Sequence, residues 1–78
     1  MNVQYKTIIH APDIKPKYRH QTILQSFDRL CKGEALLLSN DHDPKPLHYQ
    51  LKAERSGTFK WNYVKEGPYE WCVEIKRV

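Results

Sequence analysis

The sequence predicts an α/β fold, specifically an α+β two-layer sandwich with two helices on one face of a four-stranded mixed sheet. Three observations lead to this prediction. Apolar residues recur at helical spacing over residues 23–30, and an unbroken apolar run occupies residues 35–38. Large apolar residues then alternate with polar ones over residues 59–63 and 69–75. These periods follow one another in the order β-α-β-α-β-β.

The first two predicted elements are a strand over residues 5–10 and a helix over residues 16–31. An Ala-Pro-Asp segment breaks the strand. Pro16 suits the first turn of a helix, because the N–H that proline lacks would have no partner there. Gly33 ends the helix, since glycine readily adopts the left-handed conformation that follows a helix.

A second strand is predicted over residues 34–39, and its apolar run indicates burial on both faces, as in a central strand. A short second helix follows, with Asp43 as its N-cap and Pro44 as its first residue, and it ends near Gly57. Two strands joined by a helix are expected to pair in parallel through a right-handed crossover.

The last two strands form a predicted hairpin around the turn at residues 66–68. Their large apolar residues must share one face, so an odd number of loop residues is required. We therefore expect a loop of three or five residues, with a β-bulge or a glycine in the left-handed conformation.

The chain has 78 residues, which predicts a single domain over residues 1–78. No segment approaches the roughly 20 apolar residues that span a membrane, and the first residues lack a secretory h-region, so a cytoplasmic protein without membrane contact is expected. Two cysteines without CxxC spacing agree with this expectation. The net charge of +4 is scattered and no basic stripe is present, which disfavours nucleic-acid binding.

The loop after the second predicted strand is the main candidate site. Asp41, His42 and Asp43 stand there, where the ends of two parallel strands and the starts of two helices should meet. Arg19 and His20 lie one turn into the first predicted helix and should reach the same edge. All four histidines of the chain are expected near this edge.

These residues predict a ligand or metal site. His20, His42 and Asp43 would bind a divalent transition metal, and Arg19 would contact an anion, with Asp41 beside it. Simpler roles account for the same residues: Asp43 caps the second helix, and Asp41 and Asn40 satisfy N–H groups of the turn.

Several short motifs resemble an uncharacterised bacterial family, domain of unknown function 2249, which is related to the TusA/SirA-like fold. The motifs are R-H at 19–20, F-D at 27–28, G-E at 33–34, N-D-H-D-P-x-P-L-x-Y-Q over 40–50, E-G-P at 66–68 and W-x-V-x-I over 71–75. The resemblance implies a sheet in the strand order 1-2-4-3 and members that occur alone or fused to other small domains. It implies no established activity.

The function predicted from the sequence is a small non-enzymatic binding or accessory module whose partner is another protein or a small anionic ligand. A homodimer through the helix-free face of the sheet is also expected. One alternative is a sulfur-carrier or transferase-like protein that lacks the usual Cys-Pro-x-Pro cysteine of the better-known relatives. A second alternative is an RNA-associated protein that uses the aromatic residues of the hairpin, although these residues are better explained as core.

Overall fold

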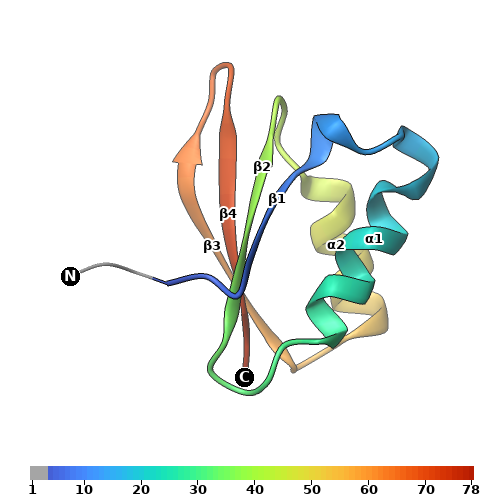
Figure 1. The fold of residues 1–78 in the computed structure, drawn as a ribbon, viewed down its shortest axis with the longest axis vertical. Coiled ribbons are helices and arrows are strands. Elements are labelled where there is room, and N and C mark those ends of the chain that lie inside the picture. Colours follow the sequence, from blue (N-terminus) through green and yellow to red (C-terminus); the bar gives the residue numbers. More distant parts are fainter. Residues whose placement is uncertain (1–3) are drawn as a thin grey trace.

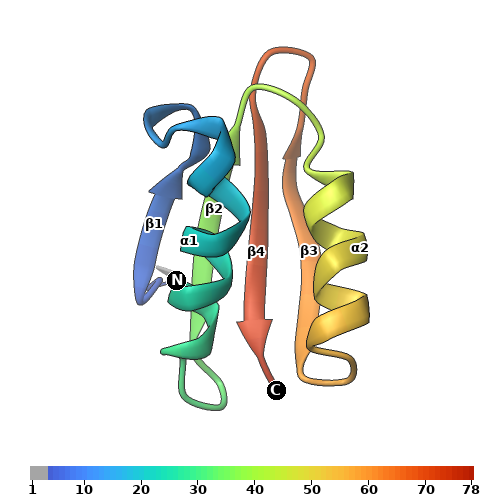
Figure 2. The same ribbon diagram turned by 90° about the vertical axis from the view of Figure 1, so that its right-hand side faces the viewer.

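The computed structural model describes residues 4–78 and shows a sheet with two helices packed on one face (Figure 1). The elements in chain order are β1 (Thr7–His10), the 3₁₀ turn η1 (Ala11–Asp13), α1 (Pro16–Asp28), β2 (Ala35–Asn40), α2 (Lys45–Glu54), β3 (Phe59–Glu66) and β4 (Trp71–Arg77). In Figure 2, α1 lies over the β1–β2 half of the sheet and α2 over the β3 edge. The predicted fold class is confirmed.

The sheet has the strand order β1-β2-β4-β3, so the expected order 1-2-4-3 is also confirmed. β1 and β2 pair in parallel, with Ile9 opposite Leu38. β4 pairs antiparallel with both β2 and β3. β2 therefore occupies a central position with a neighbour on each side, as its unbroken apolar run predicts.

The core lies between the sheet and the helices. Alternate strand residues face the helices because strand side chains have a period of two. The members of the core are Ile9, Ala11, Ile23, Leu24, Phe27, Leu30, Leu36, Leu38, Leu47, Leu51, Val73 and Ile75. Phe59, Trp61 and Tyr63 of β3 are partly buried and pack against this cluster. These hairpin aromatics therefore belong to the core side of the sheet.

Both helices are shorter than the sequence predicts. α1 ends at Asp28 rather than at residue 31, and Leu30 is buried although it lies beyond the helix. The chain turns there because the Leu30 N–H already bonds to the Phe27 carbonyl oxygen at 3.0 Å, which closes the last turn. The prediction that Gly33 ends the helix is wrong, because Gly33 lies five residues beyond Asp28, in the turn before β2, where it adopts a φ of 89°.

The predicted N-cap of the second helix is wrong. α2 begins at Lys45, the N-cap position is Pro44, and no side chain caps the helix. Asp43 precedes the N-cap and makes a different hydrogen bond, which is described with the site below. Pro46 stands in the first turn, where the missing N–H is tolerated.

The apolar residues of β3 and β4 share one face, as predicted, but the length of the loop between the strands differs from the prediction. β3 ends at Glu66 and β4 begins at Trp71, so the loop comprises residues 67–70 and the expectation of three or five loop residues is wrong. The expected β-bulge is present, because the pairing register shifts between Tyr63 and Lys65. The extra residue restores the parity that places both apolar sets on the helix side. Gly67, with φ of 56°, is the expected left-handed glycine.

The opposite face of the sheet carries no helix within residues 4–78 (Figure 1). Ile8 on this face is 67% exposed, and Lys60 and Asn62 are exposed as well. Dimerisation through this face stays a prediction. Neither helix of the described chain is long and apolar enough to cross a membrane.

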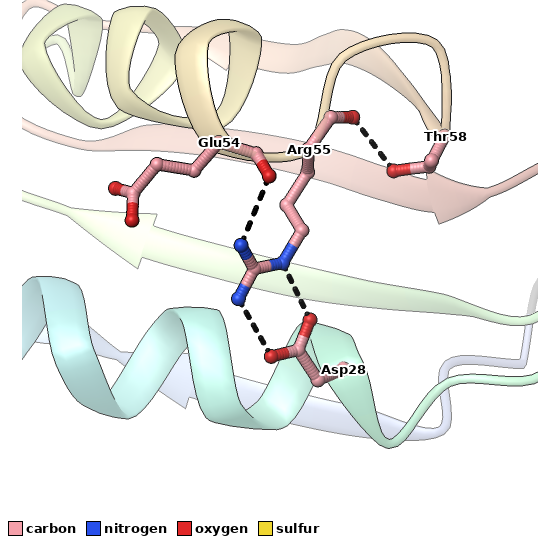
Figure 3. Close-up of polar contacts among 4 residues, drawn as sticks. All are labelled: Asp28, Glu54, Arg55 and Thr58. Atoms are coloured by element: carbon pink, nitrogen blue, oxygen red, sulfur yellow. Dashed lines mark hydrogen bonds and ion pairs between the residues drawn. The ribbon is translucent and has the colours of Figure 1, made fainter.

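An ion pair joins the C-terminal ends of the two helices (Figure 3). Arg55 donates from Nε and Nη2 to the two carboxylate oxygens of Asp28, at 2.7 and 2.8 Å. The same guanidinium donates from Nη1 to the Glu54 carbonyl oxygen at 3.0 Å. These bonds from Arg55 lower the pKa of Asp28 below its ordinary value. The pair therefore fixes the spacing of α1 and α2 at the end of the molecule away from the candidate site.

Gly67→Ala should destabilise the protein more than Gly33→Ala. Both positions have positive φ, which costs an alanine about 1–2 kcal/mol. At position 67 a Cβ would also lie 2.9 Å from Trp71 Cζ2, whereas nothing lies within 4 Å of a Cβ at position 33. Urea unfolding should show the larger loss of free energy of unfolding for Gly67→Ala; equal losses would contradict the described packing of Trp71.

Asp28→Asn should lower the free energy of unfolding at pH 7, and this deficit should disappear in acid. Because the pKa of Asp28 is lowered in the folded state, its stabilising contribution is present above the ordinary Asp value of 3.8 and is lost as the pH falls through the folded value. Urea midpoints of the native and variant proteins between about pH 7 and pH 2 measure this. Asp13→Asn, an exposed residue without a bond in the described chain, should track the native protein at each pH.

Candidate functional site

The ends of β1 and β2 and the starts of α1 and α2 lie at one edge of the sheet (Figures 1 and 2). A pocket of about 140 Å³ opens there. Its lining combines polar side chains with apolar ones. The lining residues are Ala11, Pro16, Arg19, His20, Ile23, Leu38, Asn40, His42, Pro44, Pro46 and Leu47. The location agrees with the prediction of a site at this edge.

The topology explains why these residues meet. β1 and β2 are parallel, so their carboxyl ends lie at one edge, and each is followed by a helix that packs on the same face. The turn η1 leads the chain from β1 into α1, which carries Arg19 and His20 in its first two turns. The loop between β2 and α2 carries His42.

Arg19 is the permanent cation of the pocket. Its Nε donates to the Ile14 carbonyl oxygen at 2.8 Å, which fixes the side chain against the turn before α1. The two terminal nitrogens of the guanidinium have no hydrogen-bond partner among residues 4–78. They are therefore available to a ligand, and a guanidinium presents its donors in a fork that suits a carboxylate or phosphate.

His20 and His42 each use one ring nitrogen for a structural bond. His20 Nδ1 lies 2.6 Å from Gln50 Oε1, and this contact joins α1 to α2. His42 Nδ1 lies 2.6 Å from Asp41 Oδ1. A carbonyl or carboxylate oxygen only accepts, so Nδ1 carries the proton in both rings. Nε2 is then the nitrogen that each ring has left for a ligand.

Asp41 supports the pocket from outside its lining. The hydrogen bond from His42 lowers the pKa of the Asp41 carboxyl, and the charge of Arg19 acts in the same direction. Asp41 is therefore a carboxylate over the physiological range. The effect of Arg19 also indicates that α1 and the loop after β2 share one electrostatic environment.

Asp43 does not line the pocket. Its Oδ1 accepts a hydrogen bond from the Tyr63 hydroxyl at 2.7 Å, and its Oδ2 lies 4.0 Å from Lys45 Nζ. Burial raises the pKa of Tyr63, and the bond to Asp43 raises it further. Asp43 thus anchors the loop to β3, a role that the sequence did not indicate.

The predicted metal ligands are not assembled. Within residues 4–78, no three histidine, cysteine, aspartate or glutamate side chains come together as a group that could hold a metal ion. His20 and His42 line one pocket, but Asp43 is committed to Tyr63. His20, His42 and Asp43 are therefore not gathered into one group in this structure, and metal binding by these three residues stays a prediction.

Only two of the four imidazoles, those of His20 and His42, line this pocket. His10 pairs with Ser39 in the sheet register and its Nδ1 lies 3.1 Å from Ser39 Oγ, on the face without helices. His48 lies against β3, where its ring stacks on Trp61 with centroids 4.4 Å apart. Burial lowers the pKa of His48. The period of the strand and the face of α2, respectively, direct these two rings away from the pocket.

Asn40 lines the pocket, although the sequence predicts for it only a hydrogen bond within the turn. Its side-chain Oδ1 does accept the Asp41 N–H at 2.8 Å, as expected for a turn residue. However, Asn40 is only 7% exposed and lines the pocket. Because its oxygen is engaged, the amide nitrogen is the free end, and it has no partner among the described residues. The sequence does contain a sign of this position, because strand residues two apart share a face and Asn40 therefore points to the helix side with Leu36 and Leu38.

Comparisons with known proteins identify a family but no activity. A family model described as "Uncharacterized conserved protein (DUF2249)" matches residues 8–77. No curated protein matches the chain. No solved structure matches it either.

Tyr63→Phe should lower the free energy of unfolding by about 1–2 kcal/mol, because it removes the donor to Asp43 and leaves a partly buried carboxylate oxygen without its bond. Tyr49→Phe is the matched control: Tyr49 is 64% exposed and should cost less than about 0.5 kcal/mol. Urea unfolding at pH 7 measures both. Indistinguishable losses would mean that the Tyr63–Asp43 bond does not anchor the loop.

Proposed function

The chain belongs to the DUF2249 family of uncharacterized conserved proteins, and because this membership assigns no activity, we propose from the pocket that the protein is a non-enzymatic module that binds a small anionic ligand. The single observation that carries the proposal is Arg19. Its terminal guanidinium nitrogens have no partner in the described chain, and the residue lines a pocket together with two imidazoles. A cation held in place with unused donors is suited to an anion.

The two histidines strengthen this proposal. Each has Nδ1 committed to an acceptor, so protonation would turn Nε2 into a second donor that a bound anion can use. The starts of α1 and α2 lie at the same edge and add favourable partial positive charge. Asp41 carries the opposing charge, but its carboxylate is bonded to His42 and does not line the pocket.

A binding role suits the site better than catalysis. The His42–Asp41 pair resembles a general base with its orienting carboxylate, yet the two side chains are 61% and 67% exposed. A base in that setting faces water rather than an enclosed substrate. No serine, threonine or cysteine lines the pocket, so the lining offers no hydroxyl or thiol nucleophile.

The sulfur-carrier alternative also has less support. Cys31 lies beyond the C-terminal end of α1, and Cys72 lies in β4. Neither residue lines the pocket. A helix C-terminus disfavours the thiolate that sulfur transfer requires.

Arg19→Gln should weaken the binding of a small carboxylate about tenfold or more, measured by calorimetric titration with benzoate at low salt. Lys17→Gln is the matched control, because it removes the same charge from the same helix start, while Lys17 lies over the Tyr18 ring and outside the pocket. Its effect should stay below about twofold. Equal weakening by both variants, or no binding to the native protein, would refute the proposal.

A further inference from the structure

We infer that the ligand is a small monocarboxylate with an apolar body of about four to six carbon atoms, rather than a phosphate or another fully polar anion. This inference rests on the proposed function, since it specifies which anion the pocket takes. Three features of the pocket lead to it: its apolar wall, the prolines at the helix starts and the buried amide of Asn40.

The wall of the pocket is part of the core. Ala11, Ile23, Leu38 and Leu47 all line it, and each is at most 2% exposed. These side chains are held by packing on both helices and on β2, so the wall is rigid and cannot offer hydrogen bonds. Because these four side chains are already almost fully buried, the apolar surface that a ligand can cover comes largely from the exposed rings of Pro16 and Pro46. A fully polar anion would lose hydration against this surface without replacement, whereas an apolar body gains from the contact.

The volume sets the size of that body. The pocket measures about 140 Å³. An apolar cavity of about 150 Å³ is known to accommodate benzene, a molecule of six carbon atoms. The pocket therefore suits a branched or cyclic body of that size with its charged group toward Arg19.

The prolines argue against phosphate. Helix starts bind phosphate through the free N–H groups of the first turn. Here Pro16 is the first residue of α1, Pro44 is the N-cap of α2 and Pro46 stands in its first turn, and all three line the pocket. Each proline replaces a backbone donor with apolar ring surface. With these backbone donors removed, the Arg19 guanidinium is the main cationic donor of the pocket, and its single positive charge suits a ligand with a single negative charge.

Asn40 supplies the polar contact inside the pocket. Its amide nitrogen is the free donor of a residue that is only 7% exposed, because the oxygen is bonded to the Asp41 N–H. Among residues 4–78, Trp61 Nε1 is the one fully enclosed side-chain donor without a partner, so the Asn40 nitrogen keeps some exposure and a ligand in the pocket can reach it. A carboxylate oxygen would satisfy it while the other oxygen meets Arg19, so Asn40 is a binding residue of the proposed site.

The native protein should be titrated calorimetrically with 3-methylbutanoate, acetate, inorganic phosphate and the neutral 3-methylbutanamide. We expect 3-methylbutanoate to bind at least about tenfold more tightly than acetate, because three further carbon atoms are buried. Phosphate should bind no better than acetate. Acetate or phosphate binding as tightly as 3-methylbutanoate, with the Arg19 dependence intact, would overturn this inference and leave the proposed function standing. Equal binding of the acid and its amide would overturn the proposed function itself.

Asn40→Asp provides the second arm. The new carboxylate can still accept the Asp41 N–H, but it replaces the free donor with a like charge, so 3-methylbutanoate binding should fall at least tenfold. Asn62→Asp makes the same change on the helix-free face, where Asn62 is exposed, and should leave binding within about twofold. If the two variants bind equally well, Asn40 does not contact the ligand. The ligand series on the native protein is decisive even if Asn40→Asp does not fold.

Discussion

Burial of β2 on both faces decides where every other element can lie. Leu36 and Leu38 are fully buried on the helix side, and on the other side Ala35 and Ser39 are buried while Leu37 is half-buried. A strand of this kind needs a partner at each edge and a layer above it, which β1, β4 and the two helices supply. Its last residue, Asn40, is consequently buried at the end of the strand, where it lines the pocket.

Two polar contacts join the helices, one at their C-terminal ends and one nearer the pocket, and they help to give the pocket a defined shape. Arg55 and Asp28 join the C-terminal ends of α2 and α1 through two hydrogen bonds (Figure 3). His20 and Gln50 join the same helices nearer the pocket, at 2.6 Å. The space between the helix starts is then limited by side chains of the core. A site on such fixed elements can be preorganised for its ligand, which favours selective binding.

The spacing of apolar residues along the sequence is sufficient to predict the fold, because apolar residues must face the core and their spacing therefore distinguishes helices from strands. It also indicates the edge at which the pocket lies, since the topology of two parallel strands follows from the crossover helix. The hydrogen-bond and stacking partners of individual side chains cannot be predicted from this spacing. The local sequence predicts a helix cap at Asp43, but this side chain bonds to Tyr63, twenty positions away in the chain. The sequence likewise gives no sign that the His48 ring stacks on Trp61 rather than lining the pocket. Such contacts depend on which strand lies beneath a helix, and a local pattern does not contain that information.

Nuclear Overhauser contacts between a bound ligand and the protein would locate the site directly. With 3-methylbutanoate in excess, the ligand methyl protons should show contacts to the methyl groups of Ile23, Leu38 and Leu47, which line the pocket. Contacts to Ile8 or Leu37, which belong to the helix-free face by the pairing register, would contradict the account, as would bound ligand without contacts to the pocket wall.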